Sequence, residues 1–316
     1  KVAIRADILL GLTACIWGFA FTAQRAGMSY IGPFTFNGIR FLLGGAALVP
    51  LILFNDKKSR KSGLKNKQSG KFLILSSVAA GVCLFAGASL QQIGIVWTTA
   101  GNCGFLTGLY VVLVPIFGIF LGRKTGLQTW VGAVLALAGL FFVIGGVKLQ
   151  TVNRGDILTA VSGIFWAAHV LLIDALVQRT NALRLACGQF IVCGLLSFAF
   201  ALTNFSGGLY AGFGAEMGAS GFHPSMLLDA AIPLLYGGIM SVGVAYTLQV
   251  VAQRDAPPAH ASVILCMESV FAAIGGILLL SEKPGPRILL GFLLMLAGML
   301  ATQWDVIMKR SAKESG

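Results

Sequence analysis

Long apolar segments, separated by short polar ones, make up most of the chain. Ten of these segments are about 20 residues long, the length of a helix that spans the ~30 Å hydrocarbon core of a bilayer. The pattern therefore predicts an all-α polytopic membrane protein with ten transmembrane helices. The predicted spans are residues 7–27, 33–54, 72–97, 102–122, 127–147, 156–178, 183–203, 230–252, 259–280 and 287–308.

The second half of the chain repeats the first. Trp17 and Trp166 lie in matching sequence at an offset of 149 residues, and Gln91 matches Gln249 at an offset of 158. Each half carries five predicted spans, and because five is odd the second copy has to cross the membrane upside down. Many secondary transporters are built from such inverted repeats. Residues 1–150 are expected to form the first five-helix repeat and residues 151–316 the second, inverted one, together one membrane domain.

Composition and charge agree with a membrane protein. The chain is 57% hydrophobic and only 11% charged, whereas soluble domains carry about 25% charged residues. The net charge of +12 does not indicate nucleic-acid binding, because seven basic residues crowd into residues 57–71, between two predicted spans. The positive-inside rule places this loop in the cytoplasm. On that orientation 17 of the 23 Lys and Arg residues are cytoplasmic, and so are both termini.

Polar and aromatic side chains deep in the spans are the candidates for function, since each is costly in hydrocarbon unless it faces protein or water. The first pair of repeat mates is Trp17 and Trp166, each ~15 Å into its span and so near the midplane. Two interpretations stay open for this pair. The indoles either pack in the core or form a flat wall of a central cavity that stacks on a substrate.

Each of two further pairs of repeat mates contains one charged residue. Tyr110 and Glu268 are repeat mates, each ~12 Å deep. Glu268 is the carboxylate nearest the bilayer centre, and it is expected to bind a substrate ammonium group or to carry a coupling proton. Arg40 and Gln189 are the third pair. Arg40 either forms an ion pair with Glu268 or holds a substrate carboxylate through two hydrogen bonds.

One further residue, His169, lies one helical turn after Trp166 and either faces the same cavity or bonds to a neighbouring backbone carbonyl. The substrate-binding residues predicted from the sequence are Trp17, Arg40, Tyr110, Trp166, His169, Gln189 and Glu268. Other polar residues are expected to have local roles. Gln91, Tyr246 and Gln249 are placed nearer the span ends, Asp7 and Asp156 are interpreted as helix caps, and Pro115 is expected to kink its span.

Several chemistries are missing from the sequence. It has no G-x-x-x-x-G-K-[ST] phosphate loop, no H-E-x-x-H or G-x-S-x-G motif, and no cluster of cysteines and histidines. The six cysteines all fall in or beside apolar segments without metal-ligand spacing, and are interpreted as small packing residues. No cofactor, no metal ion and no enzymatic activity are therefore expected.

Several stretches of the sequence resemble a known family. They are W-G-F-A-F at 17–21, T-A-G-N-C-G-F-L-T at 99–107, E-S-V-F-A-A at 268–273 and L-S-E-K at 280–283. In order and spacing they resemble the EamA family of the drug/metabolite transporter superfamily. The resemblance implies two inverted five-helix repeats, a central cavity and export of small metabolites, often amino acids. One departure is visible, since many members have Gly-Glu after the fourth and ninth helices, where this chain has Gly122-Arg123 and Ser281-Glu282.

The function expected is secondary transport in the bacterial inner membrane, with export of an amino acid or similar small polar metabolite by alternating access around a midplane cavity. The partners expected are a small-molecule substrate and the lipid bilayer, with a coupling proton and a homodimer as open alternatives, and no nucleic acid. A transporter of phosphorylated sugars or nucleotide-sugars is an alternative, although Arg40 alone is thin support for binding phosphate. A membrane sensor on the same scaffold is another.

Overall fold

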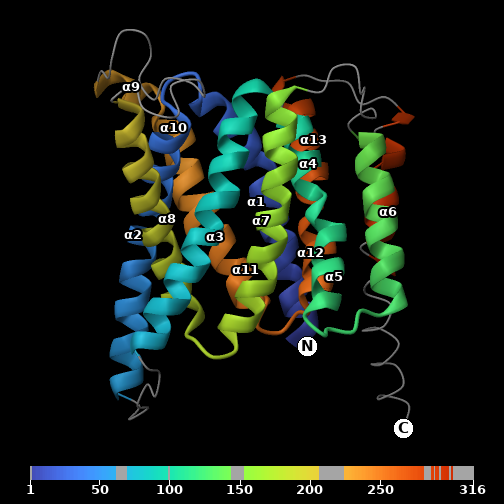
Figure 1. Ribbon diagram of the computed structural model, residues 1–316, viewed down its shortest axis with the longest axis horizontal. Helices are drawn as coiled ribbons and strands as arrows, with labels where there is room; N and C mark the ends of the chain where they lie inside the picture. The colour runs from blue at the N-terminus through green and yellow to red at the C-terminus, as the bar shows by residue number, and fades with distance from the viewer. Residues whose placement is uncertain are drawn as a thin grey trace.

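Figure 1 shows the computed structural model of the protein. It describes residues 2–61, 70–98, 100–143, 153–205, 224–280, 286–287, 289–291, 293–298 and 300–301. Within these residues the chain is helical, with short connections and no strand. The helices are α1 (Val2–Gly27), α2 (Pro33–Lys61), α3 (Gly70–Trp97), α4 (Ala100–Gly108), α5 (Tyr110–Phe120), α6 (Leu127–Val143), α7 (Arg154–Val177), α8 (Ala182–Phe205), α9 (Pro224–Asp229), α10 (Ala231–Leu235), the π-helix η2 (Tyr236–Tyr246), α11 (Thr247–Ala252), α12 (Pro258–Leu265) and α13 (Glu268–Leu280).

Seven stretches of helix in the described part of the chain are long and apolar enough to cross a membrane. They correspond to seven of the ten spans predicted from the sequence. The predicted spans 127–147 and 259–280 contain the shorter apolar helices Leu127–Phe142 and Pro258–Ala272. The span 287–308 contains Leu289–Gly298, and its last residues lie outside the described part. Residues 206–223, between the predicted spans 183–203 and 230–252, also lie outside it.

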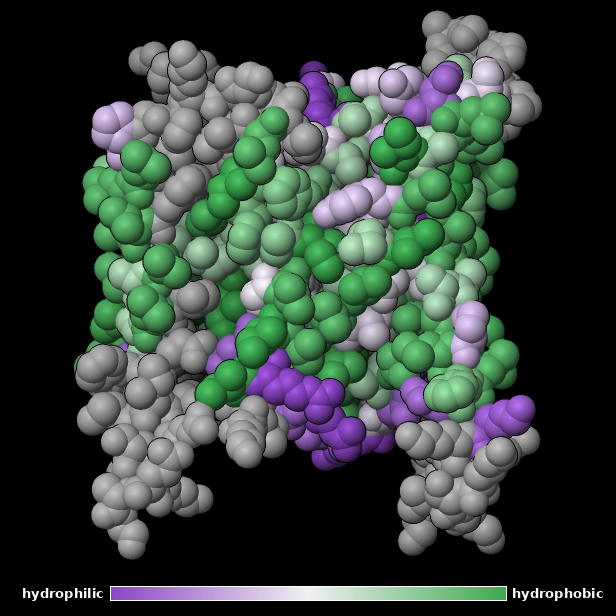
Figure 2. Space-filling model, turned by 180° about the vertical axis from the view of Figure 1, so that it is seen from behind, coloured by the Kyte–Doolittle hydropathy of each residue, from purple (hydrophilic) through white to green (hydrophobic). Residues whose placement is uncertain are grey.

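The helices stand side by side with their axes roughly parallel (Figure 1). The face at which α1 begins, called here the amino-terminal face, also carries the ends of α2, α5, α7 and α11. The outer surface of the bundle is apolar, as expected for contact with lipid. Phe120 is 83% exposed and Leu127 is 74% exposed, for example. Figure 2 shows apolar residues over the middle of the molecule and hydrophilic ones gathered toward its two ends.

Helix α1 lies at the centre of one half of the bundle and contacts α4, η2, α11, α12 and α13, while α3 packs against α7 and α8. Glycines set the closest of these crossings. A Cβ atom added at Gly18 would clash with the backbone of α13 at Glu268 and Ala272. One added at Gly94 would clash with α7 at Gly155. Small residues allow helix backbones to approach where lipid offers no hydrophobic driving force.

Two transmembrane stretches are broken near the middle of the bundle. The first break separates α4 from α5 at Leu109, and the second separates α12 from α13 at residues 266–267. The two breaks match in the repeat register, since Leu109 corresponds to Met267 at the offset of 158 residues. The first break lies six residues before Pro115, the position at which the sequence predicts a kink, and Pro115 itself lies inside α5. A helix tolerates proline here when neighbouring helices satisfy the freed backbone groups.

The stretch after α10 is wound as a π-helix of 11 residues, η2. It contacts α1 and α2. Long π-helices are rare, and π-helical turns occur frequently at functional sites. A side chain of α1 bonds to the backbone of this segment, with Thr13 Oγ1 donating to the Ala245 carbonyl at 3.2 Å. The π-helix ends at Tyr246, which faces the middle of the molecule.

Candidate substrate site

A small cavity of about 40 Å³ lies in the middle of the bundle, enclosed by helices of both halves. It has room for about one water molecule. Side chains from α1, α2, α3, α4, α5, α7, η2, α11, α12 and α13 form its walls. The lining residues are Trp17, Phe21, Gln24, Arg40, Gln91, Thr107, Tyr110, Trp166, Val170, Ser241, Tyr246, Gln249, Leu265 and Glu268.

The cavity brings together five of the seven residues predicted to bind substrate, namely Trp17, Arg40, Tyr110, Trp166 and Glu268. The other two are not among its lining residues. His169 and Gln189 are fully buried beside it and bond to each other, with 2.8 Å between His169 Nε2 and Gln189 Oε1. His169 therefore bonds to a side chain of α8, and not to a backbone carbonyl. The role of these seven residues in binding stays a prediction.

Tyr246, which is placed nearer a span end on sequence grounds and has no predicted binding role, is a lining residue of the cavity. Its ring lies 4.5 Å from Trp17 and 6.1 Å from Trp166, centroid to centroid. Phe41, Phe190 and His169 surround the same ring at 5.9 to 6.3 Å. Tyr246 thus joins the two repeat-related tryptophans into one aromatic wall. Gln91 and Gln249 were also placed near span ends, yet both are buried at the cavity.

The two tryptophans differ in their hydrogen bonding. Trp17 Nε1 donates to the Ser241 carbonyl of η2 at 3.1 Å. Trp166 Nε1 is buried and has no hydrogen-bond partner among the described residues. Buried indole N–H groups usually find a partner. The spare donor of Trp166 is therefore available to a molecule in the cavity.

Tyr110 and Glu268 each occupy the first position of the helix that follows a break. Both are buried, at 3% and 4% exposure. The Tyr110 hydroxyl and the Glu268 carboxyl group interact with each other, while Glu268 Oε1 has no hydrogen bond of good geometry among the described residues. The neighbouring Ser269 donates to the Gly104 carbonyl at 3.0 Å and so ties α13 to α4 at this level. The breaks thus bring a phenol of one half and a carboxyl group of the other half together at the cavity.

Arg40 is almost fully buried, at 2% exposure. Its Nε donates to Asn37 Oδ1 at 2.9 Å, and its guanidinium carbon lies 4.9 Å from the centroid of the Phe41 ring. In the described part of the chain no ion pair joins Arg40 to Glu268. The cavity therefore contains a cation and a carboxylate that are not paired with each other. A buried charge that lacks a counter-ion is costly, and such groups mark binding or transport pathways.

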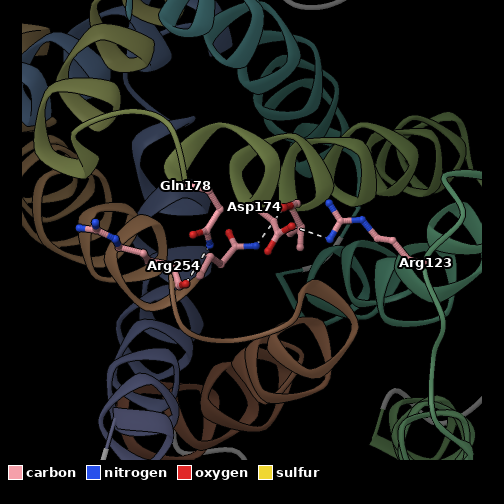
Figure 3. A network of polar contacts seen from close by, with 6 residues as sticks. Arg123, Asp174, Gln178 and Arg254 are labelled. Atoms are coloured by element: carbon pink, nitrogen blue, oxygen red, sulfur yellow. Dashed lines mark hydrogen bonds and ion pairs between the residues drawn. The ribbon is translucent and has the colours of Figure 1, made fainter. Parts of the chain in front are cut away.

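The amino-terminal face is held together by polar contacts to α7 (Figure 3). Arg123, after α5, forms an ion pair with Asp174 of α7. Gln178 Nε2, at the end of α7, donates to the Arg254 carbonyl at 2.8 Å. Loops from both halves are thus tied to one helix.

Asp7 does not cap α1, contrary to the expectation, because α1 begins at Val2 and Asp7 lies 2.8 Å from His260 Nε2.

Polar contacts also close the opposite face. Arg25 at the end of α1 donates to the Val96 carbonyl of α3 at 2.7 Å. Asp156 is a helix cap as predicted, since Asn153 and Asp156 form a capping box at the start of α7. Asp156 also accepts a hydrogen bond from Thr98. Polar contacts therefore join helices at both faces.

No group of three or more His, Cys, Asp or Glu side chains in the described residues is arranged to hold a metal ion. The chemistry available at the cavity is therefore that of one guanidinium, one carboxyl group, aromatic rings and amide and hydroxyl groups. These groups recognise a ligand by charge, hydrogen bonds and stacking.

Comparison with known proteins identifies the family. The sequence model described as the EamA-like transporter family matches residues 4–145 and again residues 153–303. An uncharacterized transporter of Archaeoglobus fulgidus is 29% identical over 302 residues, which cover 94% of this chain and 85% of that protein. The uncharacterized transporter YoaV of Bacillus subtilis is 23% identical, over 92% of this chain and 95% of its own length.

Two further similarities are more distant. Human solute carrier family 35 member F6 is 25% identical over 181 residues, which cover 52% of this chain and 48% of that protein. The crystal structure of another protein superposes with a TM-score of 0.69 at 15% identity, covering 94% of this chain and 96% of that one, and shows that the two share a fold. From the match over both halves of its sequence, the chain is a membrane transporter that belongs to the EamA-like transporter family.

Proposed function

We propose that the protein is a secondary transporter that exports amino acids or related small polar metabolites across the bacterial inner membrane by alternating access. The observation that carries the proposal is the cavity between the two halves, in which Arg40 and Glu268 face the same space without forming an ion pair. An α-amino acid carries a carboxylate and an ammonium group on the same carbon atom. Its two charges complement this pair.

In this mechanism Arg40 binds the substrate carboxylate and Glu268 binds the ammonium group. Trp17, Trp166 and Tyr246 supply an apolar, stacking wall for the side chain. Glu268 is also the group that carries a coupling proton, because it is the one carboxyl group among the described lining residues and is buried. The substrate ammonium group and the proton then compete for the same carboxylate, so that binding of one requires release of the other.

The cavity of about 40 Å³ is far smaller than the pockets of about 300–1,000 Å³ that hold small molecules. Binding therefore requires the helices around it to separate. The contacts at the two faces have to open in turn, which is the requirement of alternating access. The positive-inside rule places the amino-terminal face in the cytoplasm, so that loading occurs from there and release on the opposite face.

Phosphorylated sugars and nucleotide-sugars fit this cavity less well. A phosphate group with two negative charges calls for clustered cations, and Arg40 is the one Lys or Arg among the described lining residues. Glu268 would also repel it. A membrane sensor on the same scaffold would need no unpaired charges at a central cavity.

Counterflow in proteoliposomes tests the proposal. The purified protein is reconstituted into liposomes, which are loaded with one unlabelled compound from a panel of amino acids, and uptake of the same compound in labelled form is measured. A sugar phosphate and a nucleotide-sugar are tested in the same way for comparison. We expect exchange of at least one amino acid, reduced about tenfold or more in Glu268→Gln and in Arg40→Gln, because each removes a charge-assisted contact. Asp229→Asn, which neutralises an exposed carboxylate away from the cavity, is the matched control. Normal exchange by both cavity variants would rule out the charge assignment.

A further inference from the structure

A second cavity opens at the amino-terminal face. Its volume is about 350 Å³, against about 40 Å³ for the central cavity. It lies among α1, α5, the loop between α5 and α6, and the loop between α11 and α12, and is called here the charged vestibule. Its lining residues are Asp7, Val114, Pro115, Gly118, Arg123, Lys124, Thr125, Gly126, Thr129, Leu171, Asp255, Ala256, Pro257, Pro258, Ala259 and His260. The volume falls within the range of sites for small metabolites.

The charges of the vestibule are sorted by wall. Both cations, Arg123 and Lys124, belong to the loop between α5 and α6, whereas the carboxylates belong to α1 (Asp7) and to the loop between α11 and α12 (Asp255). Arg123 is paired with Asp174 and Asp7 with His260. Lys124 and Asp255 are exposed and have no ion-pair partner among the described residues. One free charge of each sign therefore faces the same space.

The inner end of the vestibule is apolar and lies next to the central cavity. Val114 lines the vestibule one helical turn, or ~6 Å, beyond Tyr110 of the central cavity. Leu171 lines the vestibule and its neighbour Val170 lines the central cavity. A molecule in the vestibule is thus separated from the central site by about one turn of α5, and on α7 consecutive residues line the two cavities.

Sorted charges select a class of ligand. A dianion or a dication would be attracted by one wall and repelled by the other. A zwitterion places its carboxylate toward Lys124 and its ammonium group toward Asp255, while an apolar side chain contacts Val114 and Leu171. We propose that the charged vestibule is a second binding site, which takes zwitterionic small molecules and loads them toward the central cavity. The loading role rests on the proposed function; binding of a zwitterion to the vestibule does not.

Protection of an engineered cysteine tests the site directly. Thr125 lines the vestibule and is half-buried, so Thr125→Cys places a thiol in it. Labelling of the purified full chain with the neutral reagent N-ethylmaleimide is followed by intact mass, with the parent protein as the control for its six native cysteines. The probes are L-leucine and its two single-charge analogues, 3-methylbutylamine and 4-methylpentanoate. We expect L-leucine to slow labelling more than either analogue does.

The charge variants are made in the Thr125→Cys protein. Lys124→Gln and Asp255→Asn should each raise the L-leucine concentration needed for half-protection. In the double variant the increase should be roughly two- to tenfold. Lys57→Gln makes the same charge change on exposed α2 outside the vestibule and should leave protection unchanged. Protection should persist in Glu268→Gln, because that residue belongs to the central cavity.

The outcomes separate the two proposals. If L-leucine is exchanged in proteoliposomes but does not protect the thiol introduced by Thr125→Cys, the vestibule site is wrong and the transport proposal stands. If L-leucine protects that thiol but no amino acid is exchanged, the vestibule site stands and the transport proposal fails. Equal protection by L-leucine and by both analogues, or equal loss in Lys57→Gln, would also overturn the zwitterion site.

Discussion

Trp17 and Trp166 are equivalent in the repeat but not in their environments. The indole of Trp17 is fixed by its hydrogen bond to the Ser241 carbonyl, and that of Trp166 has no such bond. Tyr110 and Glu268 show the same divergence, since two equivalent positions carry a phenol and a carboxyl group. The scaffold is therefore repeated while the chemistry at the cavity is asymmetric. A substrate with two different ends fits such a site better than a symmetric one.

The difference between the tryptophans can be measured. Trp17→Phe should lower the free energy of unfolding by about 1 kcal/mol more than Trp166→Phe does, because only the first substitution removes a hydrogen bond and leaves the Ser241 carbonyl without its donor. Thermal unfolding of the two variants in the same detergent checks this. Equal destabilisation would mean that the Trp17–Ser241 bond contributes nothing in solution.

At the scale of the helix, the crossing of α1 and α13 depends on one glycine. A Cβ atom at Gly18 would meet backbone atoms of α13, which cannot move without displacing Glu268. Gly18→Ala should therefore destabilise the protein by about 1–3 kcal/mol and slow transport. Gly11→Ala on the same helix is the control, because a Cβ atom there meets nothing within 4 Å. Gly11→Ala should be neutral or slightly stabilising. A thermal shift assay on both variants is sufficient, and equal melting temperatures would contradict the close crossing.

The end of α5 depends on a different property of glycine. Gly122 has a φ of 72° and closes the helix with two hydrogen bonds, from its own N–H to the Ile119 carbonyl and from the Arg123 N–H to the Gly118 carbonyl. This is the Schellman arrangement, and it directs Arg123 toward Asp174. Gly122→Ala should cost about 1 kcal/mol of stability, because alanine is strained at positive φ. Gly118→Ala should not lower the stability, because Gly118 has no positive φ and an added Cβ atom would make only ordinary van der Waals contacts. Denaturant titration of both variants distinguishes them.

At the scale of the whole molecule, the sequence was sufficient for the helical membrane fold, because the periodicity and length of apolar segments report directly on lipid. The predicted spans 72–97 and 156–178 agree closely with α3 (Gly70–Trp97) and α7 (Arg154–Val177). The repeat offset also identified positions that meet at the cavity, since Trp17 and Trp166, and Tyr110 and Glu268, all line it. Five of the seven predicted residues line it.

The features that could not be predicted from the sequence depend on how the helices pack against one another and on where a helix is broken. Tyr246 was not predicted to line the cavity because depth counted along the chain takes no account of how the helix that carries it packs. The break at Leu109 lies six residues before Pro115, the expected position, because it follows from tertiary contacts and not from a residue that stops helices. Lys124 and Asp255 are 131 positions apart, and nothing in the sequence indicates that their loops face one cavity.

The orientation in the membrane is a testable property of the whole molecule. Alkaline phosphatase, which folds only outside the cytoplasm, should be active when fused after Tyr30 and inactive when fused after Thr125, since the positive-inside rule places the amino-terminal face in the cytoplasm. A cytoplasmic reporter such as green fluorescent protein should give the reverse pattern. Activity of the phosphatase after Thr125 would invert the topology and with it the direction of transport.

The contact of α1 with α13 through Gly18 has a consequence for how the molecule opens. Because Gly18 carries no side chain, α1 and α13 pack closely at this point, and we expect the pair to move as one unit while other helices swing. Spin labels on α1 and α13 should then keep a single separation when substrate is added, while labels on α1 and α7 should show two. Gly18 lies next to Trp17 on α1, and Glu268 begins α13. The closely packed pair of helices therefore also contributes side chains to the wall of the central cavity.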